Sequence, residues 1–296
     1  MAGHQPIARA RSANQSNRFP GGDRTTGMPD SSRPVPDTDF SGQTILVTGA
    51  SGGIGEEFAR RFARLGADLV LVARSGDRLR EIQQELIGRH PGRSILVVEL
   101  DLSVPDAGQS IERALAHAAV RVDGLVNNAG VGSHGRFPGE SPESIAAQIQ
   151  LNCGALVDLT ARFLPSMLQR GTGLVINVAS TAAFQPLPTM AVYAASKAFV
   201  LSFSEALWTE TRMSGVRVLA LCPGATETAF FSRTGKEFLT AGRETPGQVV
   251  DTALKALAGT RPTVVSGFVN LLGSIGSRFL PRHVVARASA SVVRAK

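Results

Sequence analysis

The sequence predicts an α/β protein: a single-domain, Rossmann-type, doubly wound parallel sheet of about seven strands with helices on both faces. From residue 43 onward, apolar runs alternate with amphipathic helical patterns. The runs are nearly continuous in Val, Ile and Leu, which is typical of parallel strands buried on both faces. A glycine-rich turn joins the first run to the first helical pattern. Repeated strand–helix–strand units with right-handed crossovers produce such a sheet.

The predicted elements follow in order along the chain. The strands are 44–49, 68–73, 94–100, 124–130, 173–180, 216–224 and 263–267. The helical pattern GEEFARRFARLG after the first strand ends at Gly66, a predicted C-cap. Another helix is predicted to start near Ser141, where SPES has the form of an N-cap box. A long later helix carries Trp208, for which packing in the core or at a subunit interface is predicted.

The alternation defines one predicted domain, 41–266. Residues 1–40 are rich in Arg, Ser, Gly and Pro, so a disordered tail without a signal peptide is predicted there; whether Met28 is the true start stays open. Residues 267–296 form a basic, amphipathic C-terminal extension. The chain is 43% hydrophobic and 19% charged and has no run of eighteen apolar residues, so no transmembrane helix is expected. Its two cysteines, predicted to be reduced core residues, indicate a cytoplasmic protein.

The positive charge is concentrated at the C-terminus. The net charge is +7, and residues 261–296 contain six Arg or Lys and no acid, so the remainder is almost neutral. This distribution argues against nucleic acid as a partner. Five apolar residues recur in the extension at helical spacing: Phe268, Leu271, Leu272, Ile275 and Phe279. Packing on the domain, packing on a partner subunit, and peripheral contact with anionic lipid stay open for them.

The turn TGASGGIG follows the first strand and opens the first helix. Gly49, Gly53 and Gly55 allow the backbone to turn sharply and approach a pyrophosphate, and the helix N-terminus offers free N–H groups and a positive dipole end. A dinucleotide site is predicted here. Cys153 and Cys222 lie in apolar runs, and the chain has no metal-ligand spacing, so reduced core cysteines and no metal are predicted.

The segment YAASK holds the only tyrosine, Tyr193, and one of four lysines, Lys197, in a chain with twenty-seven arginines. One helical turn apart, the two side chains share a face. An ammonium about 4 Å from a phenol contributes roughly 4 kcal/mol at an effective dielectric of 20. That would lower the phenol's pKa by about three units, which predicts Tyr193 as the acid/base. Ser180 ends the fifth strand, where open α/β sheets bind ligands, which favours a functional role over that of an ordinary turn serine.

Taken together, TGASGGIG, ELDLS, NNAG, Asn152, Ser180, YAASK and PGATET resemble the short-chain dehydrogenase/reductase family, in its classical branch, across residues 43–266. The resemblance implies hydride transfer between a nicotinamide and a carbonyl/alcohol carbon. It implies a catalytic tetrad of Asn152, Ser180, Tyr193 and Lys197, in which Lys197 also grips the ribose and Asn152 holds a water that relays protons. It also implies a homodimer or homotetramer paired through helices at 141–169 and 192–212.

The same resemblance implies the cofactor contacts. Asp101 would contact the adenine amine, the backbone of Asn127 and Ala129 would pass beneath the adenine and ribose, and Thr226 or Thr228 would lie near the carboxamide, with ordinary loop hydroxyls as the alternative for these threonines. The complete predicted cofactor set is Gly49, Ser51, Gly53, Ile54, Gly55, Arg74, Ser75, Asp101, Leu102, Asn128, Ala129, Gly130, Tyr193, Lys197, Pro223, Gly224, Thr226 and Thr228.

The end of the second strand predicts NADP(H) as the cofactor. A carboxylate at this position binds the ribose 2′-hydroxyl in folds that prefer NAD, but here the strand ends in Ala73, Arg74 and Ser75. The guanidinium of Arg74 suits a 2′-phosphate, and Ser75 adds a hydroxyl. The nearest acid, Asp77, is predicted to cap the next helix.

The long connection 225–247 is predicted to be a substrate lid, because loops of that length are often functional. Phe230, Phe231, Phe238 and Leu239 would give it an apolar inner face, suited to a lipophilic ketone, aldehyde or ketoacyl compound. His134 is expected at the cleft rim, solvated and not catalytic. Two alternatives stay open: a non-enzymatic NADP(H)-binding sensor or scaffold, and a membrane-surface reductase that uses residues 268–296.

Overall fold

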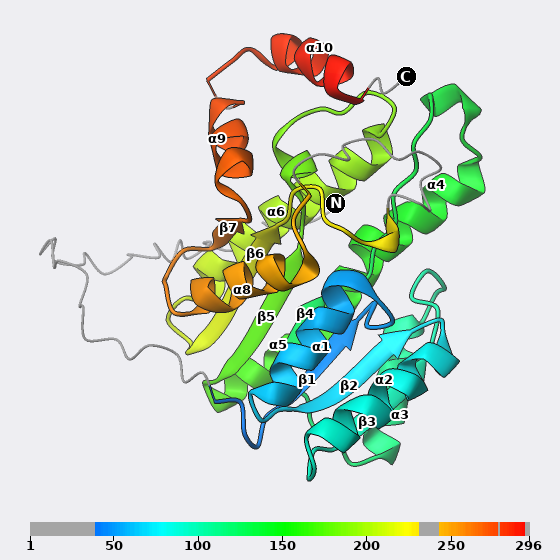
Figure 1. Ribbon diagram of the computed structural model, residues 1–296, viewed down its shortest axis with the longest axis vertical. Coiled ribbons are helices and arrows are strands. Elements are labelled where there is room, and N and C mark those ends of the chain that lie inside the picture. The colour runs from blue at the N-terminus through cyan, green and yellow to red at the C-terminus, as the bar shows by residue number, and fades with distance from the viewer. Residues whose placement is uncertain (1–38, 231–242, 278, 294–296) are drawn as a thin grey trace, which may run out of the picture. The chain divides into compact units, whose positions relative to one another are not determined.

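The computed structural model describes residues 39–230, 243–277 and 279–293. Within these ranges, seven parallel strands form one sheet in the order β3-β2-β1-β4-β5-β6-β7 (Figure 1). The strands are β1 Thr44–Thr48, β2 Asp68–Ala73, β3 Ile95–Glu99, β4 Gly124–Asn127, β5 Gly173–Val178, β6 Val216–Cys222 and β7 Thr263–Val265. The predicted doubly wound parallel sheet is confirmed.

Two hydrophobic cores lie on opposite faces of this sheet, because alternate strand residues point to opposite sides. Ile45 and Val47 of β1 pack with α1 (Gly53–Arg64), α2 (Gly76–Arg89) and α8 (Pro246–Leu257). Leu46 packs with α3 (Ala107–His117) and α5 (Ala155–Arg170), and α6 (Ala191–Thr211) joins this face through the half-buried Trp208. Core packing, one of the two predictions for Trp208, is therefore present.

The strand order places a ligand crevice between β1 and β4. The chain leaves β1 toward β2 and β3 on one side and later returns to β4 on the other. The connecting loops therefore diverge at the carboxyl ends of these two strands, and open α/β sheets bind ligands at such a point. Thr48 ends β1 and Asn127 ends β4 at this position.

The helix termini test several local predictions. Gly66, just beyond the C-cap Leu65, has φ +89°, as expected of the residue that ends a helix. The helix α4 (Pro142–Ile149) is capped by Ser141, whose Oγ accepts a hydrogen bond from Ser144 N at 3.1 Å. The prediction that Asp77 caps α2 is wrong.

The N-cap of α2 is Ser75, and Asp77 lies inside the first turn. There its carboxylate accepts a hydrogen bond from Arg80 at 2.7 Å. A negative charge in the first turn still interacts favourably with the helix dipole. Asp77 therefore supports the start of α2 without capping it.

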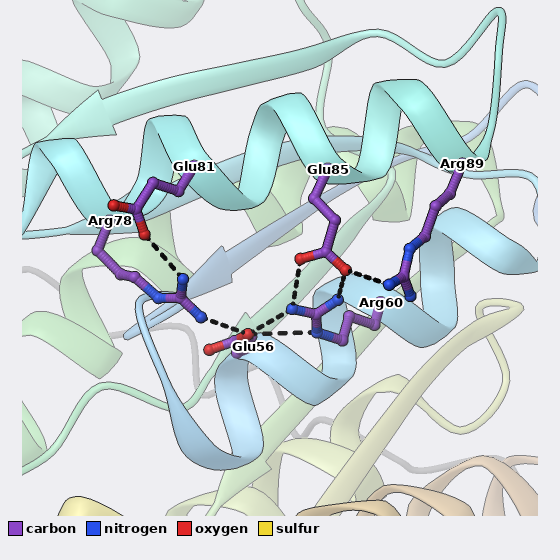
Figure 2. A network of polar contacts seen from close by, with 6 residues as sticks. All are labelled: Glu56, Arg60, Arg78, Glu81, Glu85 and Arg89. Atoms are coloured by element: carbon purple, nitrogen blue, oxygen red, sulfur yellow. Dashed lines mark hydrogen bonds and ion pairs between the residues drawn. The ribbon is translucent and has the colours of Figure 1, made fainter.

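An ionic network joins α1 to α2 (Figure 2). Glu56 accepts hydrogen bonds from Arg60 at 2.6 Å and from Arg78 at 2.9 Å. Arg60 also pairs with Glu85, and Arg78 with Glu81. Because Glu56 lies in the first turn of α1, the network fixes the start of this helix, directly after the glycine turn.

Both ends of the domain carry further packing. Phe40 packs edge-on against Phe62 with ring centroids 4.9 Å apart, so the folded domain includes Phe40. Most of the predicted tail, residues 1–38, lies outside the described residues. After β7 come α9 (Phe268–Gly276) and α10 (Arg282–Val293). Among the described residues, no helix is both long enough and apolar enough to cross a membrane.

Candidate functional site

A cavity of about 620 Å³ opens at the carboxyl ends of the strands. It brings together eighteen of the twenty residues predicted as catalytic or cofactor-binding: Gly49, Ser51, Gly53, Ile54, Arg74, Ser75, Asp101, Leu102, Asn128, Ala129, Gly130, Ser180, Tyr193, Lys197, Pro223, Gly224, Thr226 and Thr228. Gly55 and Asn152 do not line it. Apart from Tyr193 and Lys197, which lie on α6, the eighteen residues follow the carboxyl ends of six strands, so the cavity depends on the sheet order.

The glycine turn is tightly packed on its neighbours. Gly49 has φ +66°, and a Cβ there would lie 2.8 Å from Asn128 Nδ2. Gly53 has φ +57°, and a Cβ there would lie 2.8 Å from Thr228 Cγ2. At Gly55 a Cβ would clash with the Gly49 carbonyl oxygen. Gly55 therefore lets the helix start close behind the turn and does not itself face the cavity.

Thr48 is a functional residue that the sequence reasoning missed. Its hydroxyl donates to Val126 O at 3.1 Å and accepts from the backbone N–H groups of Asn128 and Ala129 at 2.9 and 3.0 Å. The side-chain amide of Asn128 donates back to Thr48 O at 2.9 Å. Thr48 thus ties NNAG to the glycine turn. Its place as the first residue of TGASGGIG was the available signal.

The side chain of Asn127 points away from the cavity. Its side chain is buried and donates to Thr160 at 3.1 Å and to Asn177 at 2.9 Å. Asn127 is also absent from the cavity lining, where Asn128, Ala129 and Gly130 lie. The side chain of Asn127 therefore links β4 to β5 and α5.

Tyr193, Ser180 and Lys197 meet at one end of the cavity. Tyr193 and Lys197 lie one turn apart on α6, and the Lys197 ammonium is 5.9 Å from the centre of the Tyr193 ring. Ser180 follows β5, and its hydroxyl lies close enough to Tyr193 to lower the pKa of the phenol in part. The Ser180 hydroxyl also accepts from Ala182 N at 3.1 Å, which fixes the start of the short helix η3 (Thr181–Phe184).

The expected lowering of the Tyr193 pKa by Lys197 is wrong for this arrangement. Burial raises the pKa of Tyr193 above its ordinary value, and the nearby Ser180 hydroxyl offsets this only in part. The Lys197 ammonium instead donates to Val178 O at 2.8 Å, so it is directed at the end of β5. The spacing of Tyr193 and Lys197 predicts that their side chains share a face of the helix, but it does not predict where the ammonium points.

Lys197 is itself strongly perturbed. Its side chain is buried, and burial lowers the pKa of the ammonium to about 8. The fraction of Lys197 that is protonated therefore changes within the pH range in which enzymes commonly work.

Asn152 stands behind this group, in a π-helical turn, η2 (Gln150–Gly154), between α4 and α5. Such turns often occur at functional sites. Its Oδ1 accepts from Val131 N and its Nδ2 donates to Val131 O, both at 2.9 Å. A Cβ on Gly130 would lie 3.2 Å from Asn152 Oδ1 and 3.4 Å from Lys197 Nζ, so both groups are close to this glycine.

Ser196 is a second residue that the sequence reasoning missed. Its hydroxyl accepts from Asn152 Nδ2 at 2.9 Å and donates to Tyr193 O at 2.7 Å. This pair of bonds connects the π-helical turn to the backbone of α6. Ser196 lies inside YAASK, between the two residues that drew attention to this segment.

The opposite end of the cavity carries Arg74, Ser75 and Asp101. The Arg74 guanidinium is 61% exposed and lies 3.9 Å from the Asp101 carboxylate. Burial acts to raise the pKa of Asp101, but hydrogen bonds from Ser103 and the charge of Arg74 outweigh it, so the pKa lies below its usual value. An exposed cation and an ionised carboxylate therefore face the same space.

The wall beside Tyr193 is apolar. The Phe230 and Tyr193 rings are 5.3 Å apart, and a Cβ on Gly132 would touch both. Phe230 and Met190 line the cavity, whereas Phe231, Phe238 and Leu239 lie outside the described residues. His134 Nε2 is 3.2 Å from Thr189 Oγ1 and does not line the cavity.

Three kinds of comparison bear on this site. The family model described as short chain dehydrogenase matches residues 43–237. The ketoacyl reductase HetN of Nostoc sp. is 30% identical over 235 residues, which cover 77% of this chain and 79% of that protein.

Two solved structures are also similar. A short-chain dehydrogenase from Sphingobium yanoikuyae, in complex with NADPH, has a TM-score of 0.71 and 36% identity and covers 80% of this chain and 93% of its own. A bulky-bulky ketone specific alcohol dehydrogenase from Comamonas testosteroni has a TM-score of 0.69 and 30% identity. The match covers 81% of this chain and 99% of that one.

Proposed function

Because the chain belongs to the short-chain dehydrogenase family, we propose that it is an NADP(H)-dependent oxidoreductase that interconverts a carbonyl and an alcohol. The observation that carries the proposal is the meeting of Tyr193, Ser180 and Lys197 at one end of a cavity whose other end presents Arg74. The reacting groups and the cation suited to a 2′-phosphate thus share one space.

The residues present fit a dinucleotide. The positive-φ glycines Gly49 and Gly53 bring the backbone close to the cavity, and the N-terminus of α1 directs free N–H groups toward a pyrophosphate. Arg74 would pair with the 2′-phosphate, Ser75 would donate a hydroxyl, and Asp101 would accept from the adenine amine. Lys197 and Tyr193 would hold the nicotinamide ribose. A bound nicotinamide would supply or accept the hydride.

The protein's own residues then manage the oxygen and its proton. In reduction, Ser180 would hydrogen-bond the carbonyl oxygen and stabilise the negative charge that develops there. Tyr193 would donate its phenolic proton to that oxygen, and in the reverse direction accept it. Because burial raises the pKa of Tyr193, the phenol is held in the protonated form that reduction requires.

Lys197 and Asn152 would restore the proton. Lys197 Nζ and Asn152 Oδ1 both border Gly130, since a Cβ added there would lie 3.4 Å from the first and 3.2 Å from the second. A water held there by Asn152 would connect Lys197 to solvent. The bonds of Asn152 to Val131 keep its amide fixed for this task.

The substrate proposed is a lipophilic ketone, aldehyde or ketoacyl compound. Phe230, Met190 and Gly132 give the space beside Tyr193 an apolar wall. Among the similar proteins, one is named as a ketoacyl reductase and one as specific for bulky ketones. We also propose a cytoplasmic homodimer or homotetramer paired through the helices of residues 141–169 (α4 and α5) and 192–212 (α6), where Leu168 and Phe199 are exposed.

The test is to follow NADPH absorbance with a panel of ketones, aldehydes, ketoacyl thioesters and steroids, for the native protein and Tyr193→Phe. The change removes one hydroxyl and little volume, so NADPH affinity should survive. Turnover should fall by about 10²–10⁴, as expected for loss of a general acid. Turnover that survives in the folded, NADPH-binding variant would disprove the role of Tyr193. A native protein that binds NADPH and reduces nothing would favour a sensor.

A further inference from the structure

The helix α9 exposes its apolar side and packs its polar side against the domain. A surface helix normally buries its apolar stripe and exposes its polar one. In α9 the side chains of Phe268, Leu272 and Ile275 share one stripe and are 73%, 55% and 46% exposed. Val269 and, after the helix, Phe279 are 81% and 82% exposed. We call these five residues the C-terminal apolar face.

The polar side of α9 is the side that touches the domain. Asn270 Nδ2 donates to Ser266 O at 2.8 Å and to Glu244 at 3.3 Å, and Ser274 is buried. Just past the helix, Ser277 Oγ donates to Phe184 O at 3.3 Å. These bonds hold α9 in an orientation that directs its apolar stripe outward, so the exposure is a consequence of specific contacts.

The helix α10 is anchored in the same way and presents positive charge. Ser289 Oγ donates to Pro186 O at 2.6 Å, and Val285, one turn earlier, is buried. Arg287, two residues after Val285, is exposed on the opposite side of the helix, and Arg282 is exposed at its first residue. In Figure 1, α9 and α10 lie beyond β7, at the edge of the sheet opposite β3.

The charge of the segment selects its partner. Residues 261–296 contain six Arg or Lys and no Asp or Glu. A second copy of the chain docked here through a two-fold contact would bring two such segments together, and they would repel. An anionic bilayer offers an apolar layer for the aromatic and aliphatic side chains and negative headgroups for the arginines. We infer that the C-terminal apolar face, with the arginines of α10, docks on an anionic lipid surface.

This docking would place the reacting end of the cavity near the lipid. Phe184 and Pro186, which accept the bonds from Ser277 and Ser289, lie in the segment that leads from Ser180 to Tyr193. Asn270 lies against Gly224, another cavity residue. A lipophilic substrate dissolved in the bilayer would have a short path to the cavity.

The experiment is co-sedimentation of the full chain with phosphatidylcholine vesicles that contain 30% or no phosphatidylglycerol, at about 50 mM and 500 mM salt (about the range over which surface charges become screened). Binding is expected only with the anionic lipid and should weaken at high salt. The double variant Arg282→Gln/Arg287→Gln should bind about 25-fold more weakly, because each basic residue near the surface contributes about fivefold.

The apolar part is tested by Phe268→Ser/Leu272→Ser, which should lower the partition coefficient at least about tenfold. Met213→Ser, at an 88% exposed position in the turn between α6 and β6, is the matched control and should bind like the native chain. NADPH binding should be unchanged in all variants, since none of these residues lines the cavity.

Either of two results would overturn the inference. The first is a native chain that stays in the supernatant with anionic vesicles at low salt. The second is a double apolar variant that binds vesicles like the control but changes from dimer to monomer in sedimentation velocity, which would identify a second copy as the occupant.

Discussion

Arg74 is the residue on which the proposed choice of NADP(H) depends. It lies at the end of β2, lines the cavity and is 61% exposed, so a phosphate can reach it with little desolvation. Its neighbour Asp101 carries the opposite charge 3.9 Å away but belongs to the next strand end, where an adenine amine would lie. The proposed preference for NADP(H) depends on this division of roles.

Arg74→Ala should erase most of that preference. A charge-assisted bidentate contact contributes roughly 1.5–3 kcal/mol, so the native protein should bind NADPH about tenfold to a hundredfold more tightly than NADH. Fluorescence titration with both cofactors measures this. Arg80→Ala is the control, because Arg80 is also an exposed arginine but does not line the cavity. Equal affinities for both cofactors in the native protein would contradict the assignment.

Lys197 should make cofactor affinity depend on pH. Burial lowers the pKa of its ammonium from 10.5 to about 8, so the charge is present below that pH and is lost above it. If the ammonium holds the ribose, the Kd for NADPH should rise up to about tenfold between pH 7 and pH 9, since one proton gives one decade per pH unit.

Lys197→Met supplies the comparison: the variant should bind NADPH more weakly, with a Kd that does not change between pH 7 and pH 9. A pH dependence that persists in the variant would assign the titration to another group.

The stability of the fold should change with pH in the opposite direction. Because burial disfavours the charged form of Lys197 in the folded state, the free energy of unfolding should increase as pH rises from about 8 toward 10.5.

At the scale of elements, the glycine turn depends on the helices that follow it. Glu56, in the first turn of α1, accepts from one arginine of its own helix and one of α2 (Figure 2). Its side chain is only 15% exposed, whereas that of Glu81 is 65% exposed. Glu56 is therefore a largely buried acceptor shared by two arginines, whereas Glu81 is a solvated member of the network.

Glu56→Gln should lower the free energy of unfolding by about 1–2 kcal/mol, because two guanidinium groups lose a partly buried common acceptor. Glu81→Gln, which removes only a solvated partner of Arg78, should change it by less than about 0.5 kcal/mol. Urea unfolding of both variants measures the difference. Equal effects would show that the network does not depend on Glu56.

At the scale of the whole molecule, the cavity joins parts of the chain that are distant in sequence. Its lining runs from Gly49 to Phe230 and includes the ends of strands in both halves of the sheet. A ligand that contacts all of these loops binds the folded state and has no equivalent site in the unfolded chain.

NADPH at about one hundred times its Kd should therefore stabilise the protein by about 2.7 kcal/mol. For a domain of this size that corresponds to a rise in Tm of about 5–10 °C. Differential scanning fluorimetry with NADPH and with an equal concentration of NADH should show the larger rise for NADPH. No rise at concentrations that saturate the fluorescence titration would argue that the cofactor binds elsewhere.

The sequence determined the elements and most of the site by itself. Buried parallel strands require long apolar runs, and sharp turns require glycine, so both are visible in local patterns. The strand predicted at 68–73 has the bounds of β2, and Gly66 ends α1 as expected. Tyr193 and Lys197 shared a helix face, as one helical turn requires.

Contacts across the fold were decided only by the tertiary structure. Asn127 and Asn128 are adjacent in sequence, yet one is buried beneath the sheet end and the other lines the cavity, because successive side chains of a strand point to opposite sides. The direction of the Lys197 ammonium, the role of Ser196 and the outward orientation of α9 depend on partners 19, 44 and 93 residues away. No local pattern encodes such partners, since they are brought together only when the sheet order places their elements side by side.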